Sequence, residues 1–165
     1  MNEVQGEPRA SRSSSGCLRA LIVASGARNW ALPLNCLRET MRPQPVARVD
    51  GADEYVLGLS RIRGVAVPVV ELSRLIGEPP EQHKRYVTVK SGQGDVALAV
   101  ADVIGIYELE LAEFAMLPSL VTSARSHVIE AIACRDNQLI AVLDTMRLIP
   151  TEAWQRLSAV EARPA

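Results

Sequence analysis

The feature that most constrains this chain is a pair of short apolar runs joined by an Arg-Gly dipeptide. The segment extends from Val56 to Gly77 and reads VLGLSRIRGVAVPVVELSRLIG. Short runs rich in Val, Leu and Ile on both sides of a turn are typical of two buried strands that form a hairpin. A turn carried by two packed strands displays Arg63 at the surface, where recognition residues tend to lie.

The same pattern of short apolar runs separated by turn residues recurs along the chain. Hydrophobic residues make up 48% of the 165 residues and aromatic residues only 4%, so the core must consist mainly of Val, Leu, Ile and Ala. We predict strands at 18–25, 30–37, 55–59, 65–72, 86–90, 96–106, 128–135 and 139–144. Regularly spaced short strands predict a mainly all-β fold, a barrel or a sandwich, in one domain or two small lobes.

Helices are predicted to be few and short. A helical turn is expected at 73–76 and a short helix at 110–117. At 151–160 the spacing of Trp154, Leu157 and Val160 predicts an amphipathic C-terminal helix that packs against the β structure.

Composition divides the chain into three parts. Residues 1–16 are polar and Ser-rich, which predicts a disordered leader. The β domain is expected at 17–150, and a C-terminal helix with its tail at 151–165. Within the β domain, the segment 78–84 contains two prolines and is expected to connect two lobes.

Charge and residue spacing argue against several classes of function. The formal net charge of −1 lacks the basic excess that a general nucleic-acid-binding protein needs. The two histidines, His83 and His127, have no Cys, Asp or Glu at a recognised metal-ligand spacing, so no metal site is expected. Cys17, Cys36 and Cys134 are odd in number and far apart, which favours neither disulfides nor zinc and indicates a reducing cytosol.

Catalytic and membrane signals are missing from the sequence as well. There is no G-x-S-x-G elbow, and Gly92-Gln93-Gly94 precedes a predicted strand, so it is interpreted as a hairpin turn and not as a phosphate-binding loop. No apolar run approaches the roughly 18 residues that span a membrane. The N-terminus lacks the apolar region of a secretory signal. These observations favour a cytoplasmic binding module over an enzyme and exclude direct membrane insertion.

The segment with the Arg-Gly turn resembles the chemotaxis coupling proteins, the CheW-like domain family. The family segment reads roughly G-x-x-x-x-R-G-x-x-x-P-V-x-D-L, and its positions are occupied here by Gly58, Arg63, Gly64, Pro68, Val69, Glu71 and Leu72. Residues 37–40 resemble the V-x-E-I segment of the family's second strand, and 100–106 and 137–148 resemble its later strands. The resemblance covers 18–149. Glu71 stands where the family usually has Asp, and Ala101 stands where another Asp is usual. These departures indicate a divergent member of the family.

The resemblance implies two intertwined five-stranded SH3-like β-barrels without catalysis or cofactor. It implies an adaptor that joins the cytoplasmic tip of a chemoreceptor to the regulatory domain of a histidine kinase, recruited from the cytoplasm to membrane-associated receptor arrays. The receptor tip is expected to dock in an apolar groove between the barrels. Arg63 and Glu39 are the expected polar contacts, and Leu37 and Val65 are candidates for the apolar floor.

Each of these residues also has a purely structural interpretation. Arg63 could cap a neighbouring turn or stack on Trp30, and Glu39 could balance Arg38 or Arg42. Leu37 and Val65 could belong to the core.

Other functions remain open at the level of sequence. A CheW-like adaptor of a non-chemotactic chemosensory or surface-motility pathway would have the same motifs, and the kinase that co-purifies would distinguish it. A small β-barrel enzyme or ligand-binding protein would need a deep polar pocket with convergent titratable groups. A nucleic-acid-binding barrel would need a continuous arginine stripe with exposed aromatic residues.

Overall fold

The computed structural model describes residues 16–111 and 126–161. Three predicted segments lie wholly or mostly outside the described residues. They are the leader predicted at 1–16, except for its last residue, the greater part of the helix predicted at 110–117, and the tail at 162–165. Glu110 and Leu111, the first two residues of that helix, are instead the last residues of a strand.

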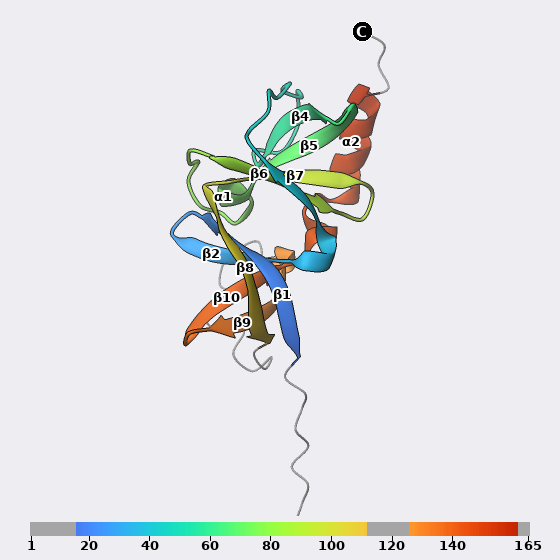
Figure 1. Cartoon of the computed structure of the whole chain (residues 1–165). Helices are drawn as coiled ribbons and strands as arrows, with labels where there is room; N and C mark the ends of the chain where they lie inside the picture. Colours follow the sequence, from blue (N-terminus) through green and yellow to red (C-terminus); the bar gives the residue numbers. More distant parts are fainter. Residues whose placement is uncertain (1–15, 112–125, 162–165) are drawn as a thin grey trace, which may run out of the picture.

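Within the described residues, ten strands form two five-stranded units, so the prediction of a mainly all-β fold is confirmed (Figure 1). The first unit is a closed barrel with the strand order β1-β2-β10-β9-β8. Its strands are β1 (Cys17–Ser25), β2 (Arg28–Pro33), β8 (Asp102–Leu111), β9 (Ile129–Arg135) and β10 (Gln138–Leu143).

The second unit is a five-stranded sheet with the order β3-β6-β7-β5-β4. Its strands are β3 (Leu37–Met41), β4 (Val56–Ile62), β5 (Val65–Glu71), β6 (Arg85–Lys90) and β7 (Asp95–Val100). Because the whole sheet lies between β2 and β8 in the sequence, the two units are intertwined along the chain. The loop after β3 returns to the sheet through a bridge between Ala47 and Leu59.

Short helices complete the fold. They are η1 (Leu34–Cys36), α1 (Leu72–Leu75), η3 (Ser126–Val128), η4 (Thr145–Arg147) and α2 (Thr151–Glu161). The C-terminal helix was predicted correctly, and Figure 1 shows it beside the sheet that holds β4 and β5. Ala153, Trp154 and Leu157 of α2 are buried in the core, whereas Val160 is exposed.

The largest hydrophobic core lies between the two units. Barrel residues such as Leu21, Val23 and Trp30 join sheet residues such as Val87 and Leu98 in one cluster of buried side chains. Each fully buried Val or Leu contributes about 1.5–3 kcal/mol relative to exposure. The barrel and the sheet therefore share most of the burial that stabilises them.

Two predicted strands are divided in the structure. The run at 30–37 ends as a strand at Pro33, and η1 then leads the chain into the sheet, so Leu37 begins β3 in the other unit. The residues that resemble the family's second strand thus lie on the third strand here. The run at 96–106 is divided at Ala101, where the chain returns from β7 in the sheet to β8 in the barrel.

The prediction that 78–84 connects two lobes is wrong as a statement of topology. The segment joins α1 to β6, and both belong to the second unit. The chain crosses between the units at η1 and at Ala101, and it returns to the sheet side once more between β10 and α2. Nothing in the local sequence distinguishes a proline-rich loop within a unit from one between units.

Candidate functional site

The Arg63–Gly64 turn has the backbone of a tight hairpin. Both central residues have positive φ angles, 51° at Arg63 and 80° at Gly64, as in a type I′ turn. A Cβ on Gly64 would meet no atom within 4 Å, so glycine is needed there for its conformation and not for space. The turn projects Arg63 from the end of the β4–β5 hairpin, as the sequence predicted.

Arg63 forms a two-pronged ion pair with Glu39. Its Nε donates to Oε1 of Glu39 at 2.8 Å, and its Nη2 donates to Oε2 at 2.7 Å. The hydrogen bonds and the charge of Arg63 lower the pKa of Glu39, and Glu39 raises the pKa of Arg63 in turn. The Arg63 side chain is nevertheless 78% exposed and that of Glu39 30% exposed, so a partner could reach the pair.

The backbone of Glu39 is fixed by Thr88 on the neighbouring strand β6. The Glu39 N–H donates to Thr88 Oγ1 at 3.1 Å, and the Thr88 hydroxyl donates back to the Glu39 carbonyl at 3.2 Å. At this point Arg38 is the extra residue of a β-bulge, because Leu37 pairs with Val89 while Glu39 pairs with Thr88. Bulges often redirect side chains near functional sites.

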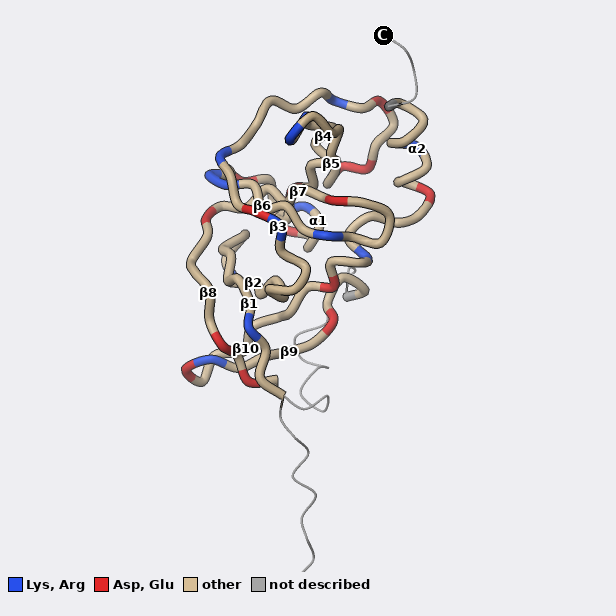
Figure 2. Tube along the Cα trace, turned by 45° about the vertical axis from the view of Figure 1, so that its right-hand side comes forward, with Lys and Arg blue, Asp and Glu red and all other residues tan. Residues whose placement is uncertain are grey.

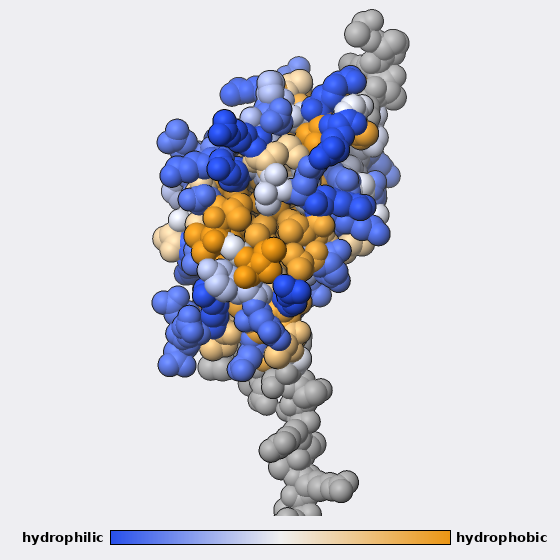
Figure 3. Space-filling model, in the orientation of Figure 1, coloured by the Kyte–Doolittle hydropathy of each residue, from blue (hydrophilic) through white to orange (hydrophobic). Residues whose placement is uncertain are grey.

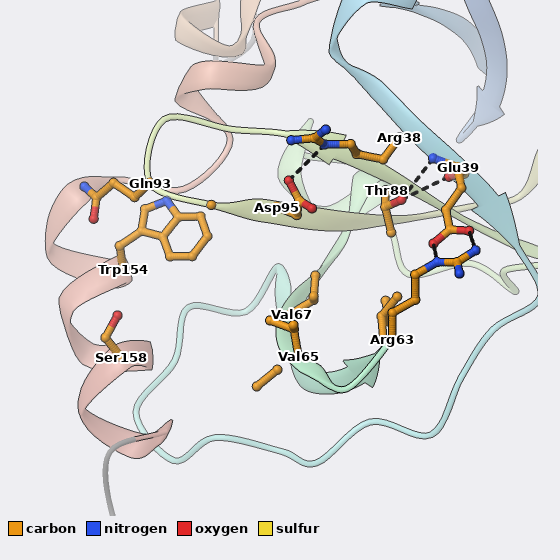
Figure 4. A pocket seen from close by; sticks show the side chains of 13 residues that line it. Arg38, Glu39, Arg63, Val65, Val67, Thr88, Gln93, Asp95, Trp154 and Ser158 are labelled. Carbon is orange, nitrogen blue, oxygen red and sulfur yellow. Dashed lines mark hydrogen bonds and ion pairs between the residues drawn. The ribbon is translucent and has the colours of Figure 1, made fainter.

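The ion pair lines one end of an open groove of about 580 Å³ (Figure 4). Trp154 and Ser158 of α2 stand at the other end, and Val65 and Val67 lie between. The groove is formed by β3, the two hairpins of the sheet and α2. Its lining residues are Arg38, Glu39, Ile62, Arg63, Val65, Ala66, Val67, Thr88, Gln93, Gly94, Asp95, Trp154 and Ser158.

Three of the four predicted site residues come together in this groove. Arg63 and Glu39 form the ion pair, and Val65 is 59% exposed beside them. Leu37 is not among the groove residues: it packs against the shared core at the start of β3. Trp30 is buried in the barrel and its indole N–H donates to the Ser25 carbonyl, so it is not the partner of Arg63.

Sequence reasoning missed the far end of the groove. Trp154 was interpreted only as a packing residue of the C-terminal helix, and Ser158 was not considered. The predicted turn at Gln93 and Gly94 is confirmed, but no local pattern indicates that it lies against Trp154. Arg38 pairs with Asp95 at 3.4 Å across the strands and not with Glu39.

A second surface lies where the two units meet. Figure 3 shows an apolar patch at the centre of the view, over the crossing of β1, β8 and β3. On β8, Ile104 and Ile106 are exposed. Ile104 is the extra residue of a bulge against β1, and Ile106 pairs with Leu21, whose side chain belongs to the shared core.

Other kinds of site find little support. Within 16–111 and 126–161 no group of three or more His, Cys, Asp or Glu residues is placed to hold a metal ion. No helix in this part of the chain is long and apolar enough to cross a membrane. Acidic and basic residues are interspersed over both units (Figure 2), which does not favour the nucleic-acid alternative.

Comparisons with known proteins agree with the architecture. The chain is 20% identical over 140 residues to the chemotaxis protein CheW of Bacillus subtilis, covering 83% of this chain and 90% of the relative. It is 18% identical over 135 residues to the chemotaxis protein CheW of Klebsiella aerogenes, covering 80% of this chain and 81% of the relative.

The fold itself has a solved counterpart. The crystal structure of the scaffolding protein TtCheW from Thermoanaerobacter tengcongensis superposes with a TM-score of 0.71 at 16% identity, covering 84% of this chain and 96% of that one. The family model of the CheW-like domain matches residues 19–153. These residues include both β units and the start of α2, and the chain belongs to the CheW-like domain family.

Proposed function

We propose that this protein is a non-catalytic adaptor that couples the cytoplasmic tip of a chemoreceptor to the regulatory domain of a histidine kinase in chemotaxis signalling. Family membership supports the adaptor role, and two relatives carry the name chemotaxis protein CheW. The protein would act from the cytoplasm, with its partners carrying the link to the membrane. Its effect would come from different affinities for the signalling states of its partners and not from lowering a reaction barrier.

The single observation that carries the proposal is the exposed Arg63–Glu39 pair at a rigid turn. An arginine whose two donors are already aligned loses little conformational freedom on binding, and its remaining N–H groups can donate to a partner's carboxylate or carbonyl oxygen. We propose that Arg63 and Glu39 form the polar contacts to the receptor tip, with Val65 beside them.

The apolar part of the interface would be the apolar patch where the two units meet. An apolar face of a partner helix needs a surface without charged side chains, and β8 offers Ile104 and Ile106 there. Leu37 would support this patch from the start of β3 and contribute at most an edge of its side chain, because it packs mainly against the core.

The test is co-sedimentation of the protein with receptor signalling tips and a kinase regulatory domain. Arg63→Asn removes the guanidinium but keeps a residue that tolerates positive φ, so the turn is preserved. If Arg63 is an anchor, its loss costs about 1–3 kcal/mol of binding free energy, roughly five- to 150-fold in Kd. Arg63→Lys retains charge without the two-pronged geometry and should be intermediate.

Arg61→Gln is the matched control. Arg61 is an exposed arginine on β4, two residues before Arg63. Its substitution removes the same charge from the same hairpin. Equal losses for both arginines would indicate a general charge effect and contradict the anchor role. Absence of binding by the unaltered protein would refute the coupling function itself.

A further inference from the structure

Two carboxylates connect the segment 77–84 to the rest of the molecule, one to the barrel and one to the sheet. Glu81 lies in this segment, and its side chain reaches the β1–β2 turn of the barrel. The Ser25 hydroxyl donates to Oε1 of Glu81 at 2.5 Å, and the Gly26 N–H donates to Oε2 at 2.8 Å. Ser25 is fully buried, so its hydroxyl needs this acceptor.

Glu71 holds the same segment from the sheet. It is the last residue of β5, and its side chain is only 2% exposed. Its Oε1 accepts the backbone N–H of Glu81 at 3.1 Å and the Ser73 hydroxyl at 3.3 Å. Its Oε2 is paired with Arg74 Nε at 2.8 Å, and His83 Nε2 lies 3.5 Å from Oε1. A buried carboxylate with these partners is a fixed point of the sheet.

The contacts form a continuous polar strap from one unit to the other. The strap runs from Glu71 through the backbone and side chain of Glu81 to the β1–β2 turn. It is separate from the covalent crossings at η1, at Ala101 and between β10 and α2. The shared apolar core holds the units together but specifies their angle weakly, because apolar contacts are not directional. Hydrogen bonds are directional and can fix that angle.

The strap ends at the last residue of β1, the barrel strand that packs against the sheet in the shared core. β1 contributes Leu21 and Val23 to the shared core and pairs along most of its length with β8. A rotation of the β1–β2 turn relative to the sheet would therefore move Ile104 and Ile106 relative to Arg63.

We propose that Glu81, oriented by Glu71, is a positioning residue that fixes the angle between the barrel and the sheet. As a consequence it sets the geometry of a partner surface that spans both units; this consequence rests on the proposed function. Glu81 need not touch the partner to act in this way.

The test compares three full-length variants. Glu81→Ala removes both acceptors. Glu81→Gln keeps one acceptor and both contacts, because its amide oxygen can accept from the Gly26 N–H while its NH₂ donates to the Ser25 hydroxyl oxygen in a bond of reversed direction. Gln82→Ala alters the exposed neighbour in the same segment and is the control. Residual dipolar couplings of the amides report the orientation of the barrel relative to the sheet in each variant.

We expect Glu81→Ala to change the relative orientation and to weaken binding of receptor signalling tips severalfold. Glu81→Gln and Gln82→Ala should retain the wild-type orientation and affinity. An unchanged orientation in Glu81→Ala overturns the inference, and so does a changed orientation with unchanged tip binding. If the wild type fails to bind tips, the proposed function falls, while the orientation measurement still decides the role of Glu81.

Discussion

At the residue scale, Arg63 has a backbone conformation that residues other than glycine adopt rarely. Left-handed backbone costs an L-residue about 1–2 kcal/mol, and here the residue in that conformation is also an exposed cation of the groove. Its carboxylate partner Glu39 is fixed by Thr88, so the turn and the bulge together determine where the guanidinium lies.

The pKa of Glu39 should lie below its ordinary value near 4.5 because Arg63 stabilises the ionised form of Glu39. A depressed folded-state pKa means that the stabilisation by the ion pair is fully present above the unfolded value and is lost as the pH falls through the folded value. The measurement is the NMR titration of the Glu39 side-chain carboxyl. In Arg63→Asn the midpoint should rise toward the ordinary value; an identical midpoint in both proteins would show that the pair does not persist in solution.

Two glycines of the Arg-Gly segment should differ in their tolerance of alanine. Gly58 has φ 143°, and a Cβ there would lie 2.1 Å from the Ala47 carbonyl oxygen. Gly64 has φ 80° with open space around it. We expect Gly64→Ala to cost about 1–2 kcal/mol of unfolding free energy for the backbone alone. Gly58→Ala should cost clearly more, since backbone atoms must also move.

Urea denaturation of the two glycine variants measures this difference. Gly64→Ala is the matched control for the backbone conformation. An equal loss in both would mean that the segment around Ala47 yields without cost. The structure separates the roles of these glycines into close approach at Gly58 and turn conformation at Gly64.

At the element scale, the existence of most strands could be predicted and their assignment to sheets could not. Apolar alternation and turn residues act locally, so they locate the hairpin that turns at Arg63 and the hairpin that turns at 91–95. The runs 30–37 and 96–106 are mostly apolar, and only tertiary packing reveals that Pro33 and Ala101 mark passages between units. Leu37 was therefore predicted on the same strand as Trp30 but begins β3, where it packs against the shared core, the structural alternative to a place in the groove floor.

The C-terminal helix should contribute to stability through the side chains that it buries. Trp154 is buried in the shared core, whereas Val160 on the same helix is exposed. Trp154→Ala should lower the unfolding free energy by about 3–5 kcal/mol, as large-to-small changes in cores do. Val160→Ala should change it by less than about 0.5 kcal/mol. The measurement is urea unfolding followed by circular dichroism; a small loss for Trp154 would mean that α2 is only loosely attached.

At the scale of the whole molecule, the groove joins residues that are far apart in sequence. Glu39, Arg63, Asp95 and Trp154 come from β3, a hairpin turn, β7 and α2. Family motifs singled out Arg63 and Glu39, because each belongs to a local pattern. Trp154 and Asp95 belong to no such pattern, and only the return of the chain from the barrel to the sheet through α2 brings them to the same groove.

The shared core implies that the barrel and the sheet unfold in one transition. Trp30 of the barrel and Trp154 of α2 lie in the same buried cluster, and these are the two tryptophans of the chain. Labelling with 5-fluorotryptophan therefore gives one ¹⁹F signal from each side of the junction. Because neither unit can expose its face of this core without exposing the other, both native signals should disappear at the same urea concentration. Separate midpoints would show that one unit stays folded without its neighbour, and a polar strap between the units could not then be holding a single rigid body.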